Sequence, residues 1–126
     1  MSDDALVLSI QSHMVHGRSG NRSAVFPLEA SGVSVDVLNT CQYSAHTAYP
    51  VLKGTVLTPS QFDELIEGLR LNEILPTYTH LLTGYIADAS IASGICALRK
   101  ELGSNLEYFC DPVLGDCGKL YNRALR

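Results

Sequence analysis

Two carboxylates in a glycine-containing turn are the residues of this chain that most directly suggest chemistry. Asp111 and Asp116 flank residues 112–115, and Lys119 follows shortly after them. Carboxylate oxygens in such a turn suit Mg²⁺ that keeps several water molecules and also binds phosphates. A lysine nearby could contact a phosphate. The alternative is a solvent-exposed acidic turn, and the spacing alone does not decide between the two.

A second set of side chains could hold a flat ring. The aromatic candidates for stacking are Tyr43, His46, Tyr49 and Tyr85. Aromatic residues more often pack in protein cores, so this alternative stays open. Ser12 is a candidate hydrogen-bond donor and not a nucleophile, because no nucleophile elbow surrounds it. Residues 17–21 resemble an anion-binding turn before a helix, although they lack a complete phosphate-loop pattern.

Short apolar or alternating runs predict the strands that would position these residues. The expected strands are residues 5–10, 33–37, 78–82 and 106–110. Residues 50–57 add a β-like stretch that Gly54 interrupts. The polar candidates therefore follow the ends of predicted strands.

Three helices are expected between these strands. The first has Asn21 or Ser23 as its N-cap and Gly32 as its stop. Pro27 is tolerable in it only within the first turn, because proline lacks a backbone donor.

The second and third helices carry clearer end signals. Thr58, Pro59 and Gln61 form a capping-box pattern, and Pro76 is expected to stop that helix. The third helix is expected to begin after Asp88 and to end at Gly103, with its apolar stripe formed by Ile91, Ile95, Leu98 and Leu102.

The order of these elements predicts an α/β fold, a mainly parallel sheet with flanking helices. Ligands bind such open sheets beyond the carboxyl ends of the strands. We therefore expect the loops after the strands to line one cleft. No helix signal follows the last predicted strand, whereas parallel strands are normally covered on both faces. The domain is accordingly expected to be truncated at its C-terminal side.

Composition and charge argue against several classes of protein. Hydrophobic residues make up 46% and charged residues 17%, which argues against disorder. The net charge is −4 without a basic stripe, so no nucleic-acid partner is expected. No apolar run reaches the roughly 18 residues of a membrane span, and no secretory signal is recognisable. A cytoplasmic location is therefore expected.

The thiols are expected to be reduced in that compartment and mostly buried. The cysteines are Cys41, Cys96, Cys110 and Cys117. Cys117 is expected to be the exposed one.

A series of sequence blocks resembles the pyridoxal kinase family in order and spacing. The blocks are residues 7–13, 20–28, 39–49, 53–54, 56–57, 82–85, 110–116 and 118–121. On this resemblance, residues 1–121 correspond to the N-terminal part of a pyridoxal kinase domain, and residues 122–126 form a divergent tail.

The resemblance implies a ribokinase-like fold and vitamin B6 salvage. The reaction would be ATP-dependent phosphorylation of the 5′-hydroxymethyl group of pyridoxal, pyridoxine or pyridoxamine, with Mg²⁺. Substrate-binding roles would fall on Ser12, Ser19, Tyr43, His46, Thr47 and Tyr85. Asp111 and Asp116 would lie on the nucleotide side and meet the metal through water or phosphate. The full-length protein would be a homodimer, with residues 50–57 as a lid or dimer contact.

Departures from the family pattern qualify this picture. Arg18 and Ser19 replace a Tyr-Val pair, so an apolar ring contact is lost and a charge is expected near the pocket. Ala45 and Ala48 replace Asn and Gly, and Ala48 is expected to be strained.

The length of the chain is the largest departure. Family members are more than twice as long, and their second half carries the glycine-rich anion hole, the catalytic aspartate and the adenine pocket. No catalytic residue is therefore assigned here, and the chain alone is expected to be inactive. Two alternatives remain: a non-catalytic vitamer-binding or regulatory form, and a kinase of another hydroxymethyl heterocycle.

Overall fold

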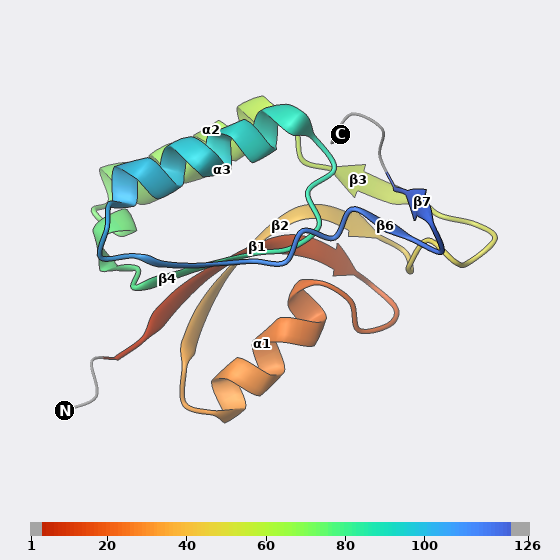
Figure 1. The fold of residues 1–126 in the computed structure, drawn as a ribbon, viewed down its shortest axis with the longest axis horizontal. Helices are drawn as coiled ribbons and strands as arrows, with labels where there is room; N and C mark the ends of the chain where they lie inside the picture. Colours follow the sequence, from red (N-terminus) through yellow and green to blue (C-terminus); the bar gives the residue numbers. More distant parts are fainter. Residues whose placement is uncertain (1–3, 122–126) are drawn as a thin grey trace.

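A five-stranded sheet forms the centre of the protein, with strand order β3-β2-β1-β4-β5 (Figure 1). The computed structural model describes residues 4–121. The strands are β1 (Leu6–Met14), β2 (Ser34–Tyr43), β3 (Gly54–Val56), β4 (His80–Thr83) and β5 (Glu107–Cys110). β1 pairs in parallel with both β2 and β4, β4 pairs in parallel with β5, and only β3 is antiparallel to its neighbour in this sheet. The predicted α/β fold with a mainly parallel sheet is confirmed.

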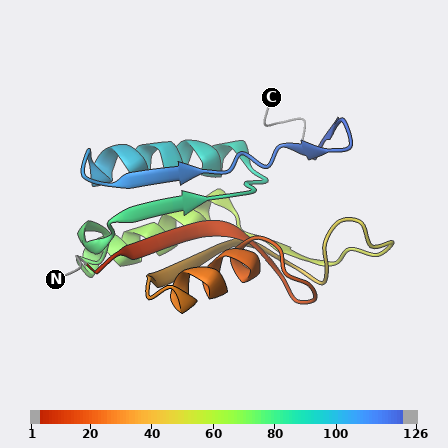
Figure 2. The same ribbon diagram turned by 60° about the horizontal axis from the view of Figure 1, so that its bottom comes forward.

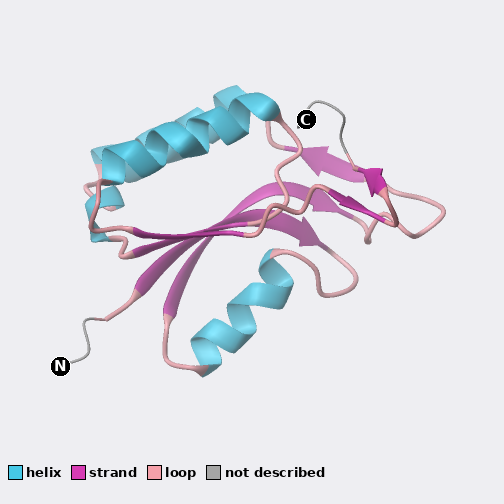
Figure 3. Cartoon of the chain, viewed as in Figure 1, coloured by secondary structure: helices cyan, strands magenta, loops and turns pink. Residues whose placement is uncertain are grey.

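Helices cover both faces of the sheet unequally (Figures 2 and 3). One face carries α2 (Pro59–Leu71) and α3 (Ala89–Leu102), while the other carries α1 (Asn21–Ala30). The buried core lies beneath α2 and α3 and includes Leu8, Ile10, Phe62, Leu81, Ile91 and Ile95. On the opposite face α1 packs against β1 and β2. Beyond α1, that face bears an open groove of about 350 Å³.

The ends of α2 and α3 follow the local signals. Thr58 Oγ1 accepts a hydrogen bond from Gln61 N at 3.2 Å, and Gln61 Oε1 accepts one from Thr58 N at 2.9 Å, which completes the capping box. Asp88 caps α3 through Ser90 N at 2.7 Å, and Gly103 ends that helix at φ 83°. α2, however, ends at Leu71, before Pro76.

Pro76 is not the residue that ends α2. The chain turns earlier, at Glu73, whose φ is 58°. Pro76 then lies within a short 3₁₀ helix, η1 (Leu75–Thr77). This expectation was wrong because the left-handed turn at Glu73 ends the helix first.

The start of α1 differs from the expectation of a side-chain cap. Gly20 is the N-cap, no side chain caps the helix, and Asn21 is its first residue. The Asn21 side chain is 2% exposed and points into the protein. Pro27 lies inside the helix and not in its first turn. A position on the exposed side of a short helix reduces the cost of the missing hydrogen bond, because water can reach the freed carbonyl. Gly32, at φ 86°, follows the helix end as expected.

β1 and β2 are longer than the alternating patterns predicted. β1 continues through Gln11, Ser12 and His13, and β2 continues through Asn39 to Tyr43. The parallel ladder between the two strands persists across an irregularity between Gln11 and His13. Polar side chains remain inside the ladder because buried partners satisfy several of them, as described below.

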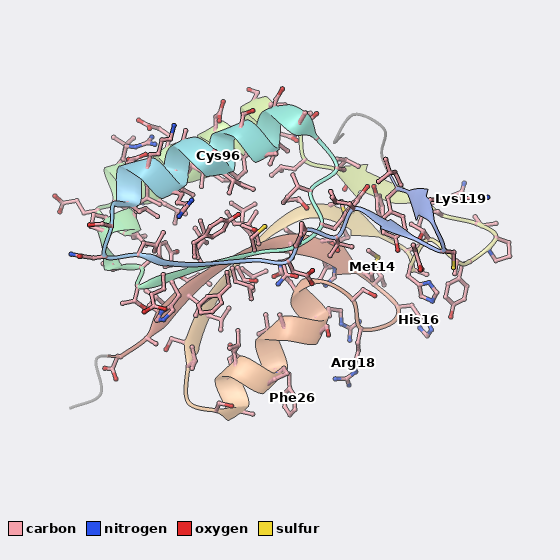
Figure 4. All side chains as sticks on the ribbon, viewed as in Figure 1. Met14, His16, Arg18, Phe26, Cys96 and Lys119 are labelled. Atoms are coloured by element: carbon pink, nitrogen blue, oxygen red, sulfur yellow. The ribbon has the colours of Figure 1, made fainter. Side chains whose placement is uncertain are left out.

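The cysteines are free thiols, and only Cys41 is buried. Burial raises the pKa of the Cys41 thiol. Cys96, Cys110 and Cys117 are exposed, so the expectation of burial was wrong for Cys96 and Cys110. Cys96 lies on an outward face of α3 (Figure 4), and Cys110 ends the edge strand β5, which has a neighbouring strand on one side only. Between residues 4 and 121, the structure contains no helix with the length and apolarity to cross a bilayer.

Candidate functional site

A cavity of about 780 Å³ opens at the carboxyl ends of the parallel strands. This volume lies within the roughly 300–1,000 Å³ that is usual for small-molecule sites. Its walls come from β1 and the β1–α1 loop, from β2 and the β2–β3 loop, and from the segments after β4 and β5. The predicted convergence of these loops on one cleft is confirmed.

Nearly all predicted site residues line this cavity. Those present in its wall are Ser12, Ser19, Tyr43, His46, Thr47, Tyr85 and Asp111. Tyr49, one of the stacking candidates, does not line the cavity, and neither does Asp116. Asp116 lies in the two-stranded hairpin of β6 (Gly115–Asp116) and β7 (Lys119–Leu120), where its carboxylate accepts a hydrogen bond from Cys117 N at 2.8 Å. Lys119 is exposed in the same hairpin (Figure 4).

Ser12 provides a buried polar contact point. The residue is 4% exposed, yet its hydroxyl makes no hydrogen bond to any other residue between 4 and 121. Buried polar groups are normally paired, so an open hydroxyl at a cavity wall suits a ligand. Gly20 packs against it at φ 58°, and a Cβ there would collide with the carbonyl and hydroxyl oxygens of Ser12.

Two tyrosines form an aromatic side of the cavity. Tyr43 ends β2, and Tyr85 follows β4. Burial raises the pKa of both phenols above the ordinary tyrosine value of about 10, so both remain protonated hydrogen-bond donors well above neutral pH. The ring of Tyr121 meets that of Tyr85 edge to face, with 5.9 Å between centroids. This arrangement can enclose a flat heterocycle.

The β2–β3 loop carries His46 and Thr47 over the cavity. Its base is closed by Ser44 N, which donates to Lys53 O at 2.7 Å. The His46 ring packs against Tyr49 with 4.8 Å between centroids. Ala48 is not among the residues with positive φ, so the expected strain at that position is absent.

Asp111 supplies the carboxylate of the cavity. Its backbone N donates to Thr83 O at 2.9 Å, which ties the segment after β5 to the end of β4. Its side chain forms no hydrogen bond or ion pair with other described residues. Residues 4–121 hold no group of three or more side chains that could bind a metal ion directly. One free carboxylate fits Mg²⁺ only where water and phosphate supply the other ligands.

Sequence reasoning missed the polar network beneath the cavity. Ser9 Oγ donates to Asn21 Oδ1 at 2.7 Å, and Gln11 Nε2 donates to Ser9 Oγ at 3.0 Å. Asn21 Nδ2 donates to Asn39 Oδ1 at 2.8 Å. The network fixes Gln11 at the cavity wall, where Gly84 leaves room for its amide. The available signal was the occurrence of polar residues inside an apolar strand, but this signal does not specify their partners.

Arg18 does not add charge to the cavity. It lines a separate, shallow groove beside α1, together with Arg22 and Phe26. Figure 4 shows Arg18 and His16 on the loop between β1 and α1. Adjacent residues of this loop therefore face different surfaces, with Ser19 in the cavity and Arg18 outside it.

Known proteins with similar sequences are pyridoxal kinases. The chain is 54% identical over 123 residues to the pyridoxal kinase of Arabidopsis thaliana, covering 95% of this chain and 40% of that protein. It is 45% identical over 119 residues to that of Homo sapiens, covering 92% of this chain and 38% of that protein. The chain thus spans about 40% of the length of these relatives. No protein-family model matches it.

Solved structures show the same similarity. The pyridoxal kinase from Leishmania donovani in complex with ADP and pyridoxamine superposes with a TM-score of 0.91 at 42% sequence identity, covering 94% of this chain and 44% of that one. The same enzyme has also been solved with ADP and pyridoxine, at a TM-score of 0.86. Over nearly its whole length, this chain is therefore homologous to pyridoxal kinases and shares the α/β fold of the matching part of their structures.

Proposed function

We propose that the chain forms the vitamer-binding part of a pyridoxal kinase, an enzyme that transfers a phosphoryl group from ATP to the 5′-hydroxymethyl group of pyridoxal, pyridoxine or pyridoxamine. The observation that carries this proposal is the cavity of about 780 Å³ at the carboxyl edge of the sheet. It gathers in one wall the residues for which the family resemblance implies ring-binding roles. The relatives bear the name of this activity, and the Leishmania enzyme is solved with ADP and a vitamer.

The proposed ring site uses residues from several elements. Tyr43 and Tyr85 pack the faces of the pyridine ring, and His46 lies close by on the β2–β3 loop. Ser12 and Thr47 hydrogen-bond to the ring nitrogen and substituents. Ser19 completes the wall on the α1 side. The hydroxyl of Ser12 suits this role because it forms no hydrogen bond with any other described residue.

The proposed nucleotide side begins at Asp111. Its unpaired carboxylate faces the cavity from the end of β5, where phosphates and water-ligated Mg²⁺ would lie. Bound Mg²⁺ would neutralise phosphate charge during transfer. Asp116 lies outside the cavity, and its role toward nucleotide or metal stays a prediction, as do a homodimer and a cytoplasmic location.

Binding without turnover is the proposed behaviour of the 126-residue chain. Phosphoryl transfer depends on positioning and on stabilisation of charge by groups around the reacting phosphate. The resemblance implies that the general base and the anion hole lie in the portion of the relatives that this chain does not span. Among the described residues, Asp111 is the only carboxylate that lines the cavity.

The test is calorimetric titration of the purified chain with pyridoxal. We expect saturable binding that Tyr85→Ala weakens by about tenfold, since an aromatic contact contributes roughly 0.5–1.5 kcal/mol beyond its buried area. Ser60→Ala, an exposed change on α2, is the matched control and leaves the affinity unchanged. Absence of binding would refute the proposal. Addition of ATP and Mg²⁺ should yield no pyridoxal phosphate, and clear product formation would refute the proposed inactivity.

A second candidate function is a regulatory form that binds vitamers without catalysis. The single carboxylate in the described cavity wall favours binding over chemistry. Mixing the chain with an intact pyridoxal kinase and following pyridoxal phosphate formation would test this candidate. An unchanged rate over a wide range of mixing ratios would rule it out. A panel of hydroxymethyl heterocycles in the same titration would test the alternative of a different substrate.

A further inference from the structure

Three serine side chains line the α1 side of the cavity. Ser12 belongs to β1, Ser19 to the loop that follows, and Ser23 to the first turn of α1. None of their hydroxyls forms a hydrogen bond with another residue between 4 and 121. We call this set the hydroxyl wall. Ser12 is 4% exposed, so its unpaired hydroxyl is reached only from the cavity, which makes the wall a built polar surface.

The charge around the hydroxyl wall favours a cation. The described residues that line the cavity include no lysine and no arginine. Arg18, adjacent to Ser19 in the chain, lies in the separate groove beside α1. Asp111 contributes a carboxylate to the same cavity. A positive ligand group therefore meets hydroxyl oxygens as acceptors and a carboxylate within one site, and no lysine or arginine among these residues repels it.

The vitamers that the proposed function would use differ in one ring substituent. Pyridoxal carries an aldehyde, which only accepts hydrogen bonds. Pyridoxine carries a hydroxymethyl group with one donor. Pyridoxamine carries an aminomethyl group that is protonated near neutral pH, as an alkyl ammonium is, and that has three donors. Three hydroxyl oxygens can accept all three of these donors, and hydrogen bonds to charged groups are stronger than neutral ones.

We propose that Ser19 and Ser23 act with Ser12 as specificity-determining residues that make this site prefer the aminomethyl vitamer, pyridoxamine, over the aldehyde, pyridoxal. The inference rests on the proposed function, because it assumes that the cavity takes a vitamin B6 ring. It adds the orientation of that ring, with its variable substituent toward the hydroxyl wall.

The experiment measures the dissociation constants of pyridoxamine, pyridoxine and pyridoxal for the 126-residue chain by calorimetry. We expect pyridoxamine to bind about tenfold more tightly than pyridoxal, which corresponds to about 1.4 kcal/mol, with pyridoxine between them. The double variant Ser19→Val/Ser23→Ala should bind pyridoxamine about tenfold more weakly and pyridoxal less than about twofold more weakly, so that the preference disappears.

Ser23→Ala alone and Ser60→Ala complete the design. Ser23 is exposed in a helix, where alanine is favourable, so the single variant is expected to fold and to lose part of the preference. Ser60→Ala is the same change outside the cavity and should keep the full preference. Circular dichroism checks that each variant is folded.

The outcomes separate this inference from the proposed function. If pyridoxal binds as tightly as pyridoxamine, or if the preference survives in both hydroxyl-wall variants, the specificity role is overturned while vitamer binding stands. If no vitamer binds the unmodified chain, the proposed function is overturned and the specificity role with it.

Discussion

Asn21 joins three parts of the fold through a single side chain. Its amide accepts from Ser9 Oγ at 2.7 Å and donates to Asn39 Oδ1 at 2.8 Å and to Leu38 O at 3.3 Å. The first residue of α1 is thereby fixed to β1 and β2 directly beneath the cavity. Because the residue is 2% exposed, water cannot replace these partners.

Asn21→Ala should lower the free energy of unfolding by about 3 kcal/mol, since it leaves buried donors and acceptors unpaired. Urea denaturation followed by circular dichroism measures this change. Asn105→Ala, in an exposed turn, is the matched control and should stay within about 0.5 kcal/mol of the unmodified chain. A loss of less than about 1 kcal/mol for Asn21→Ala would show that the network adds little to stability.

Tyr78 makes the free energy of unfolding depend on pH in the alkaline range. Its hydroxyl donates to Asp36 Oδ2 at 2.7 Å, and burial together with this bond raises the pKa of Tyr78 far above its usual range. A raised pKa means that the folded protein holds the proton more tightly than the unfolded chain. The resulting stability is complete below the ordinary tyrosine pKa of about 10 and is lost as pH rises above it.

We therefore expect the free energy of unfolding to fall between about pH 9 and pH 11, where unfolded tyrosines ionise. Tyr78→Phe should make this fall shallower, because the variant has no proton to lose at this position. Urea titrations at several pH values measure the slope. Burial also raises the pKa of Tyr43, Tyr85, Tyr108 and Tyr121, so part of the slope should remain. Equal slopes in the two proteins would contradict the assignment to Tyr78.

At the scale of elements, β3 positions the loop that carries His46 and Thr47. Gly54 begins this strand at φ 152°, and a Cβ there would collide with the carbonyl of Gln42 and the backbone of Tyr43. Only glycine allows β3 to pair this closely with β2. The β2–β3 loop depends on that pairing for its position over the cavity.

Gly54→Ala should weaken vitamer binding by about tenfold while the helices and the parallel strands stay folded, because the substitution separates β3 from the sheet edge. Calorimetry measures the affinity, and circular dichroism measures the fold. Gly68→Ala is the matched control: it lies in α2, where a Cβ meets nothing within 4 Å. This control should keep the affinity and raise stability by about 0.5–1 kcal/mol. Unchanged affinity in Gly54→Ala would show that the loop does not need β3.

At the scale of the whole molecule, the face of the sheet that bears α1 is only partly covered. The open groove of about 350 Å³ is lined almost entirely by apolar side chains, Ala5, Val7, Leu28, Val33, Leu82 and Phe109, together with His80. Phe109 is 55% exposed on β5, the edge strand that pairs in parallel with β4. Exposed apolar surface of this kind promotes association.

We expect the chain to self-associate as its concentration rises, and Phe109→Ser to reduce this association. Sedimentation velocity over a range of concentrations measures it. Leu71→Ser removes a single exposed apolar side chain, 73% exposed at the end of α2, and should leave the association unchanged. A monomer at all concentrations, or equal association in both variants, would contradict a role for the groove.

Much of the architecture was predictable because its causes are local. The capping box of α2 and the Asp88 cap of α3 involve residues at most three positions apart, so the sequence pattern contains both partners. Apolar spacing likewise indicated the strands and the apolar stripe of α3. These patterns, with the order of the elements, were sufficient for the α/β fold and for the edge of the sheet at which the site lies.

Side-chain direction depended on contacts between distant parts of the chain. Asn21 faces inward because β1 and β2 offer it partners 10 to 18 positions away. Ser19 faces the cavity and Arg18 does not, while Asp116 is held in its hairpin outside the cavity wall. Local patterns specify which residues form an element. The partners and the open space around a side chain exist only after the elements have packed, and these decide which residues form the site.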